Sequence, residues 1–215
     1  MTRRPAKSTT ARGAGRTERT GSAARADRGA HARELRIIAG RWRGRRWRFP
    51  AGTTLRPTSD RVRETLFNWL QGAVAGARCL DLYAGSGALG LEALSRGAES
   101  ALFVETDPEA GRALRALLAE WGGADGPVVH AAARRFLERP SQPFDLVFLD
   151  PPFAAGFLGD ACARLAGGGW LAAGARVYVE HARREALPDM PPGWRELRAG
   201  TAGEVGYHLY ASGPA

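Results

Sequence analysis

The 215-residue sequence contains only two cysteines, Cys79 and Cys162, and a single lysine, Lys7. Two cysteines cannot form a disulfide scaffold, nor can they supply a four-ligand metal site on their own. We therefore expect both to be small buried hydrophobic residues in a reducing, cytoplasmic environment, and we expect no metal site. Because 30 of the 31 basic residues are arginine, an arginine rather than a lysine at any one position does not by itself indicate a functional role.

Long hydrophobic runs are also absent. No stretch of 18 or more apolar residues occurs, which excludes a membrane-spanning helix. Residues 1–33 contain no leucine, isoleucine, valine, phenylalanine, tryptophan or tyrosine. Such a segment offers neither the apolar core of a secretory signal nor the apolar helix face of a mitochondrial transit peptide. It cannot bury enough apolar surface to offset the entropy of ordering, so we predict a disordered basic tail.

Positive charge is concentrated at the N-terminal end. Residues 1–48 hold 15 of the 31 basic side chains and three acidic ones, a net charge of about +12. Residues 49–215 hold 16 basic and 19 acidic side chains, a net charge of about −3. This asymmetry indicates a polyanionic partner, either a nucleic acid or an anionic membrane surface.

Residues 34–54 are predicted to form a small β-hairpin extension, because short apolar runs flank a glycine-bounded centre. Arginines and tryptophans interleave along it. Arginine supplies forked donors for phosphate, and indole offers a flat face to an unstacked base. The alternative is a solvated hairpin whose tryptophans pack on the body. The candidate nucleic-acid-binding residues are Arg41, Trp42, Arg43, Arg45, Arg46 and Trp47, with Arg61 and Arg63 from the helix that follows.

From residue 55 to residue 215 the pattern is that of one α/β domain. Short apolar runs alternate with helical segments, which predicts a parallel, doubly wound sheet. Residues 199–204 are too few for a crossover helix, so the last two strands should be antiparallel. We predict strands over 79–83, 101–105, 128–130, 144–149, 176–180, 194–198 and 205–210, and helices over 62–70, 89–96, 108–121, 133–138 and 157–166.

A glycine-rich turn follows the first strand of this domain. Gly85, Gly87 and Gly90 form the pattern G-x-G-x-x-G between a strand and a helix, and Glu105 follows 20 residues after Gly85. This pattern fits NAD, FAD or S-adenosylmethionine equally well. Asp81 favours the last of these, because a carboxylate at the strand tip would repel a pyrophosphate but suits the cationic amino group of S-adenosylmethionine.

A second motif, Asp150-Pro151-Pro152-Phe153, stands at the end of the fourth strand. It should lie beside the glycine turn at the carboxyl edge of the sheet, where open α/β sheets bind ligands. The prolines fix the backbone and remove two N–H donors, so that Asp150 and the Pro151 carbonyl can accept both hydrogens of an exocyclic amine. Phe153 can stack on the base that carries this amine. The motif therefore predicts methyl transfer to an amine.

The chain resembles the RsmD family of bacterial methyltransferases, which act on guanine N2 in small-subunit ribosomal RNA. The resemblance spans roughly residues 36–210. It is carried by the segments RIIAGRWRG (36–44), RPTSDRVRETLFNWL (56–70), LDLYAGSGALGLEALSR (80–96), Glu105 with Asp107, DPPF (150–153) and AGEVGYHLY (202–210). The tetrad alone is shared with adenine-N6 and cytosine-N4 methyltransferases, whereas the 56–70 segment is much more specific.

This resemblance implies a class I S-adenosylmethionine-dependent fold, with a Rossmann-like seven-stranded sheet whose last strand is antiparallel. It implies methylation of guanine 966 in 16S ribosomal RNA, on the small subunit or its assembly intermediate. We expect a monomeric cytoplasmic enzyme with no membrane partner, and hairpin arginines that bind this RNA.

The resemblance also assigns the cofactor site. It implies that Arg56, Pro57 and Thr58 close over the methionine end of S-adenosylmethionine. A polar residue is expected to meet the adenine amine, but alanine stands at position 132, so backbone groups must serve instead. The remaining candidates are Asp81, Tyr83, Gly85, Ser86, Gly87, Glu105, Thr106, Ala132 and Ala133.

Three other functions fit parts of the sequence. An adenine-N6 nucleic-acid methyltransferase would use the same tetrad. A non-catalytic RNA-binding assembly factor would keep the basic hairpin and a relic cofactor fold, although the intact glycines argue against it. An NAD-dependent oxidoreductase is disfavoured by Asp81 and by the lack of an evident hydride-transfer partner.

Overall fold

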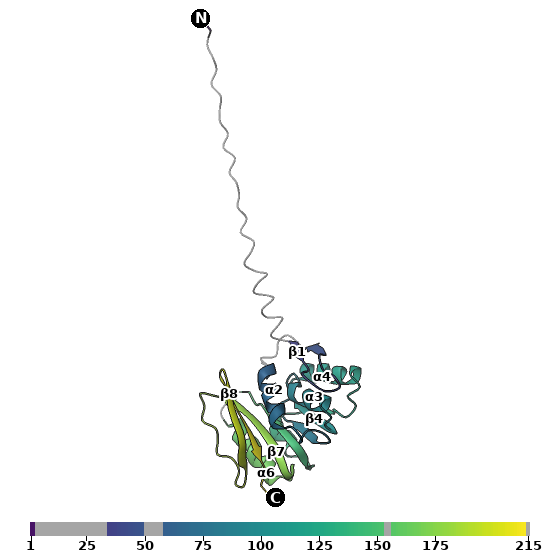
Figure 1. Cartoon of the computed structure of the whole chain (residues 1–215), viewed down its shortest axis with the longest axis vertical. Helices are drawn as coiled ribbons and strands as arrows, with labels where there is room; N and C mark the ends of the chain where they lie inside the picture. The colour runs from purple at the N-terminus through teal and green to yellow at the C-terminus, as the bar shows by residue number, and fades with distance from the viewer. Residues whose placement is uncertain (3–33, 50–57, 153–155, 214–215) are drawn as a thin grey trace. The chain divides into compact units, whose positions relative to one another are not determined.

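A computed structural model describes residues 1–2, 34–49, 58–152 and 156–213 of the chain. Arg33–Ala215 form one compact unit, which is drawn in Figure 1 with several of its elements labelled. The predicted tail 1–33 lies outside the described residues except for its first two. None of the described helices is long and apolar enough to cross a membrane.

A seven-stranded sheet with the order β5-β4-β3-β6-β7-β9-β8 organises this unit. Strands β3 to β7 run parallel to one another, while β9 is antiparallel to both β7 and β8. The predicted α/β sheet with an antiparallel last strand is therefore confirmed. The strands are β3 (Arg78–Asp81), β4 (Ser100–Glu105), β5 (Val128–His130), β6 (Phe144–Leu149), β7 (Leu171–Ala182), β8 (Arg195–Ala202) and β9 (Val205–Ala211).

Helices cover both faces of the sheet, as a doubly wound fold requires. One buried cluster joins the sheet to leucines of three helices, Leu66, Leu91 and Leu114. A second cluster on the other side holds Phe136 and Leu165. The helices are α2 (Asp60–Trp69), α3 (Ala88–Ser95), α4 (Pro108–Glu120), α5 (Ala133–Phe136) and α6 (Phe157–Gly167). Cys79 and Cys162 are free thiols buried one in each cluster, as predicted.

Local capping explains where two of the helices begin. The Asp107 carboxylate accepts the backbone N–H of Glu109 at 2.7 Å, and Pro108 occupies the first helical position of α4, as predicted. The N-cap of α2 is Ser59, whose hydroxyl accepts the N–H of Val62 at 3.4 Å. Thr58 therefore takes no part in this cap, and its hydroxyl contacts the carboxyl edge of the sheet instead.

The C-terminal strands are longer than the sequence suggested. Residues 199–204 were expected to be a loop, but the pairing of β8 with β9 continues to Ala202. The alternation of apolar residues fails there because β8 is an edge strand, where half-exposed small residues are tolerated. Gly200 is one of these small residues. A Cβ at this position would lie 2.6 Å from the Tyr207 ring, so a larger side chain would not fit there.

The predicted hairpin is present as β1 (Glu34–Arg36) and β2 (Arg46–Arg48), which are antiparallel. Figure 1 shows it beside α4. It is not a separately packed extension, because Leu35, Ile37 and Phe49 belong to the buried cluster that also contains α3. The hairpin thus shares its core with the rest of the α/β unit.

A buried carboxylate on α3 fastens the hairpin to the sheet domain. Glu92 is fully buried and accepts the backbone N–H groups of Ile38 at 2.9 Å and Ala39 at 3.0 Å. Arg63 of α2 is also fully buried, and its Nη1 lies 3.4 Å from the Glu92 carboxylate. The other Arg63 amino group donates to the Arg36 carbonyl at 2.7 Å. This ion pair joins β1, α2 and α3 in one contact.

We expect Glu92→Gln to lower the free energy of unfolding by about 2–3 kcal/mol, because the fully buried carboxylate pairs with both Arg63 and Arg96. Arg63 would keep its second partner, Asp60, at 2.6 Å. Urea denaturation measures this change. The matched control is Glu64→Gln on the exposed face of α2, which should change stability by less than about 0.5 kcal/mol. Equal effects of the two substitutions would contradict a special role for Glu92.

Candidate active site

Four carboxyl side chains gather at the carboxyl edge of the parallel strands. Asp81 ends β3, Glu105 ends β4, Asp150 follows β6, and Glu180 lies near the end of β7. The charges of Glu180 and Asp81 both act on Asp150, and those of Glu105 and Glu180 act on Asp81. The sequence predicted the first three, and the structure brings them together with the fourth.

The glycine turn after β3 has the backbone that its sequence requires. Gly85 and Gly87 have φ angles of +53° and +76°, which side chains with a Cβ rarely adopt. Gly90 serves a different purpose, since a Cβ there would lie 2.3 Å from the Phe103 ring, so it permits α3 to contact the sheet. The first two glycines therefore shape the turn, and the third allows close helix–sheet contact.

Glu105 holds this turn in place. Its Oε2 accepts the backbone N–H of Gly85 at 2.6 Å, and its Oε1 accepts that of Asp107 at 2.7 Å. The Thr106 hydroxyl also donates to Oε1 at 3.4 Å, so Oε2 is the oxygen whose second lone pair a ribose hydroxyl can use. Ribose binding by Glu105 thus stays a prediction, to which the structure adds a role in the loop itself.

Asp81 is buried beneath the same turn. Its carboxylate accepts the N–H of Gly90 at 3.0 Å. Burial raises the pKa of Asp81 to about 7, an effect that the Gly90 hydrogen bond opposes and the charges of Glu105 and Glu180 reinforce. A cationic ligand beside Asp81 would lower the pKa of this carboxyl group and favour its ionised form, which fits the amino group predicted to bind here.

Asp150 stands at the end of β6 and is partly buried. The hydroxyl of Thr58 lies 3.3 Å from its Oδ2. Burial raises the pKa of Asp150 well above its usual range, with the charges of Glu180 and Asp81 acting in the same direction and the Thr58 hydrogen bond opposing them. Pro151 is buried and Pro152 is exposed, while Phe153 lies outside the described residues.

A cavity of about 340 Å³ opens beside this motif. Pro151 and Pro152 form one wall, the first turn of α6 a second, and Glu180 with His181 at the end of β7 a third. Its volume falls within the range of small-molecule sites. The cavity is large enough for a single nucleobase, and its wall at Pro151 directly follows Asp150 in the chain.

The other predicted cofactor residues differ in their surroundings. Tyr83 is half-buried, and burial raises the pKa of its phenol to about 12. Thr106 is exposed just after β4, and Ala132 is exposed at the N-cap of α5, where it makes no side-chain hydrogen bond. Ser86 and Ala133 are buried, whereas Arg56 and Pro57 lie outside the described residues.

Among the described residues, no group of three or more His, Cys, Asp or Glu side chains could hold a metal ion.

Known proteins are similar to this chain in both amino-acid sequence and fold. The family model that matches residues 35–211 is described as Conserved hypothetical protein 95. Ribosomal RNA small subunit methyltransferase D of Escherichia coli strain K12 is 46 % identical over 177 residues, covering 82 % of this chain and 89 % of the relative. Its Haemophilus influenzae namesake is 42 % identical over 181 residues, covering 82 % and 93 %. The chain belongs to the ribosomal RNA small subunit methyltransferase D family.

The structural likeness agrees with this membership. An Escherichia coli structure described as a methyltransferase (yhhF) superimposes with a TM-score of 0.78 at 44 % identity, covering 84 % of this chain and 98 % of that one. The family match begins at residue 35 and ends at residue 211, so it includes the hairpin and all four edge carboxyls but leaves out the tail.

Both hairpin tryptophans are buried in this family member, so the predicted stacking of an RNA base on them is wrong. Trp42 is 3 % exposed, its ring packs on Trp121 at 5.5 Å, and its N–H donates to the Trp121 carbonyl at 3.0 Å. Trp47 is 8 % exposed and donates its N–H to the Ser86 carbonyl at 3.1 Å. Because both faces and both N–H groups are occupied within the protein, the alternative of tryptophans packed on the body is confirmed.

Arg63 is a second correction. It was expected to contact RNA, but it is fully buried, and its guanidinium pairs with Asp60 and Glu92. An arginine can be buried where acceptors surround its guanidinium. Arg63 pairs with Asp60 of its own helix at 2.6 Å and with Glu92 at 3.4 Å, and it donates to the Arg36 carbonyl at 2.7 Å. Arg63 is therefore a structural residue.

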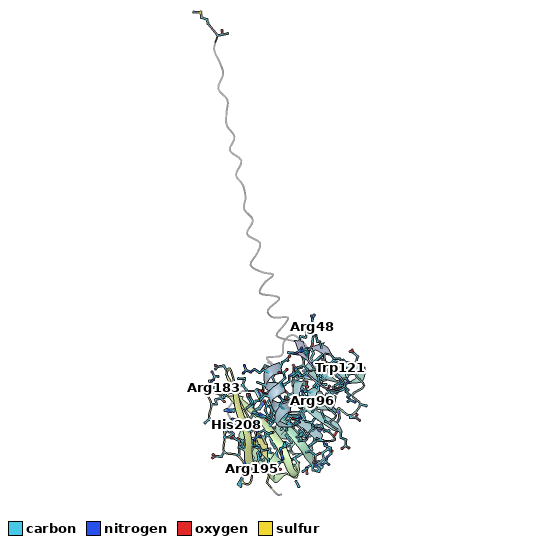
Figure 2. The ribbon with its side chains drawn as sticks, viewed as in Figure 1. Arg48, Arg96, Trp121, Arg183, Arg195 and His208 are labelled. Carbon is cyan, nitrogen blue, oxygen red and sulfur yellow. The ribbon has the colours of Figure 1, made fainter. Side chains whose placement is uncertain are left out.

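The remaining hairpin arginines do form an exposed basic surface. Arg41, Arg43 and Arg45 are exposed, and Arg46 and Arg48 extend from β2 on either side of Glu34, with which they pair. Figure 2 shows Arg48 at the same end of the folded unit as Trp121. The guanidinium of Arg41 lies 4.4 Å from the Trp42 ring. RNA binding by Arg41, Arg43, Arg45, Arg46 and the exposed Arg61 stays a prediction.

One site residue was missed from the sequence. Glu180 is an acid near the end of a buried strand, which is the same signal that identified Glu105. It passed unnoticed because no known motif contains it. The structure places it within hydrogen-bond distance of Thr58, whose hydroxyl also contacts Asp150.

Proposed function

We propose that this chain transfers a methyl group from S-adenosylmethionine to the exocyclic N2 of a guanine in 16S ribosomal RNA, at the position of guanine 966. Its substrate is the small ribosomal subunit or an assembly intermediate. The observation that carries the proposal is the position of Asp150 and Pro151 beside a base-sized cavity, in a chain 46 % identical to ribosomal RNA small subunit methyltransferase D. The enzyme acts as a cytoplasmic monomer.

The residues at the edge of the sheet fit the proposed cofactor. Gly85 and Gly87 turn the backbone without a Cβ, which lets a ligand approach closely. Asp81 suits the cationic amino group of the methionine part, and Glu105 suits the ribose hydroxyls. When bound, S-adenosylmethionine supplies an activated methyl group on a sulfonium. The surplus of carboxyls favours this cation over the pyrophosphate of a dinucleotide.

Asp150 and Pro151 orient the amine for transfer. The Asp150 carboxylate and the Pro151 carbonyl each accept one N–H of the guanine amine, which directs the nitrogen lone pair toward the methyl group. The reaction is then an in-line displacement that depends on positioning and electrostatics. No strong base is needed, because the nitrogen loses its proton after it has become cationic.

Small subunits that lack the modification provide the test. We expect the purified protein and S-adenosylmethionine to produce N2-methylguanosine, detected by mass spectrometry of nucleosides, at one position mapped by primer extension. N6-methyladenosine as the product would support the adenine-N6 alternative and overturn the guanine assignment. Cofactor binding without any transfer to subunits or to naked 16S RNA would overturn the proposal as a whole.

A further inference from the structure

A chain of hydrogen bonds links the tip of β6 to a buried acid on β7. Glu180 is 3 % exposed. Its Oε1 accepts the hydroxyl of Tyr178 at 2.9 Å and lies 3.0 Å from the hydroxyl oxygen of Thr58. The same Thr58 oxygen lies 3.3 Å from Oδ2 of Asp150. Thr58 therefore bridges two carboxyl groups.

We infer that Glu180, acting through the hydroxyl of Thr58, is a positioning residue for Asp150 in methyl transfer. This inference rests on the proposed function and adds a residue to it. Glu180 contributes no atom to the reaction.

The number of protons in the bridge supports this role. The Thr58 hydroxyl has one hydrogen and faces two acceptors, so it can donate to only one of them at a time. Tyr178 supplies Glu180 with a donor of its own, so Glu180 stays hydrogen-bonded when the Thr58 hydrogen turns to Asp150. Asp150 is then held at Oδ2, and no hydrogen bond from the described residues reaches its Oδ1. The second oxygen is thus available to accept the amine hydrogen of the substrate.

Charge gives Glu180 a second influence on Asp150. Burial raises the pKa of Glu180 to about 6, and the hydrogen bonds from Tyr178 and Thr58 oppose this rise. Burial also raises the pKa of Asp150, and the charges of Glu180 and Asp81 add to that rise. Within the described part of the chain, the ionisable groups facing Asp150 are Asp81 from β3, and Glu180 with Tyr178 from β7. Near neutral pH, ionised Glu180 disfavours the ionised form of Asp150 that accepts the amine.

Two substitutions should move the pH dependence in opposite directions. Transfer requires ionised Asp150, so the rate falls as pH drops through the raised pKa of this group. Glu180→Gln removes the like charge, and we expect the acid limb to move to lower pH, raising the ratio of the rate at pH 6 to that at pH 8 threefold or more. Thr58→Val removes a hydrogen bond to the carboxylate, and the limb should move to higher pH. Thr58→Ser keeps the hydroxyl and should restore the wild-type profile.

The experiment is a single-turnover pH–rate profile on small subunits for the wild type and these three variants. Glu204→Gln, an exposed acid in the turn between β8 and β9, is the matched control and should follow the wild-type profile. Calorimetric titration with S-adenosylmethionine should give affinities within about threefold of wild type for Glu180→Gln, and thermal melts establish that each variant is folded. If Glu180→Gln does not fold, the Thr58→Val and Thr58→Ser pair still tests the bridge.

A spectroscopic measurement separates this inference from the proposed function. The carboxyl carbon of Asp150, followed by ¹³C NMR across pH, should titrate at lower pH in Glu180→Gln than in the wild type, whatever the substrate. Wild-type protein that methylates no RNA, with this titration shift present, would overturn the proposed function alone. An active wild type with unchanged pH–rate profiles and an unchanged Asp150 titration would overturn the positioning role.

Discussion

Replacing Asp150 by alanine is expected to slow methyl transfer by about a thousandfold or more, with the affinity for S-adenosylmethionine kept within a few-fold. The side chain supplies one of the two acceptors that orient the amine. Without it, the nitrogen lone pair has no fixed direction toward the methyl group, and positioning is the main source of acceleration in such a displacement. The cofactor contacts predicted for Asp81 and Glu105 come from other strands, so cofactor binding should survive.

Single-turnover transfer to small subunits, with calorimetric titration of S-adenosylmethionine, measures the two quantities separately. Asp125→Ala, at an exposed turn before β5, is the matched control for loss of a carboxylate. It should leave both quantities unchanged. If Asp150→Ala kept the wild-type rate, Asp150 would have no place in the mechanism, and the amine would have to be oriented by other groups around the cavity.

The sheet and its edge could be predicted from the sequence for a physical reason. In a parallel sheet, residues that end successive strands meet at one edge. Asp81, Glu105 and Asp150 could therefore be placed together from strand positions alone. The glycine turn was predictable as well, because glycines at positions 85 and 87 indicate a backbone with positive φ angles, which residues with a Cβ rarely adopt.

Burial of polar and amphipathic side chains could not be predicted in the same way. Arg63 is buried where Glu92 of α3, the Arg36 carbonyl and Asp60 of its own helix surround its guanidinium. The tryptophans interleave with arginines along the hairpin. This pattern fits either a hairpin whose arginines and tryptophans are all exposed for binding, or one whose tryptophans face the protein core while its arginines face solvent. The structure shows the second arrangement, with Trp47 inside and its neighbours Arg46 and Arg48 outside. In both cases the deciding partner is distant in sequence.

Glu180 could not be identified from the sequence, because its proposed role depends on the Thr58 hydroxyl that links it to Asp150. Neither its place near the end of a strand nor the Thr58 position before a helix indicates that these residues meet. Their contact joins positions 122 residues apart. A sequence can place acids at a strand edge, but which of them share a proton or a hydroxyl depends on side-chain geometry.

The burial of the tryptophans sharpens what the hairpin can contribute to RNA binding. With no exposed indole face, the hairpin is left with the charge of its arginines, which contact phosphates without regard to sequence. We expect replacement of Arg41, Arg43, Arg45 and Arg46 by glutamine to weaken binding to 16S RNA about a hundredfold at moderate salt. The plot of log affinity against log salt should lose about three units of slope, because Arg46 is already paired with Glu34.

Filter binding across a series of salt concentrations measures this slope. The matched control replaces the same four arginines by lysine, which keeps the charge and should keep most of the slope. Both variants should remain folded, since the four arginine side chains are exposed and the Arg41–Trp42 contact is worth about 1 kcal/mol or less. An unchanged slope in the glutamine variant would move RNA docking to another surface. A slope lost equally in the lysine variant would show that guanidinium geometry matters more than charge.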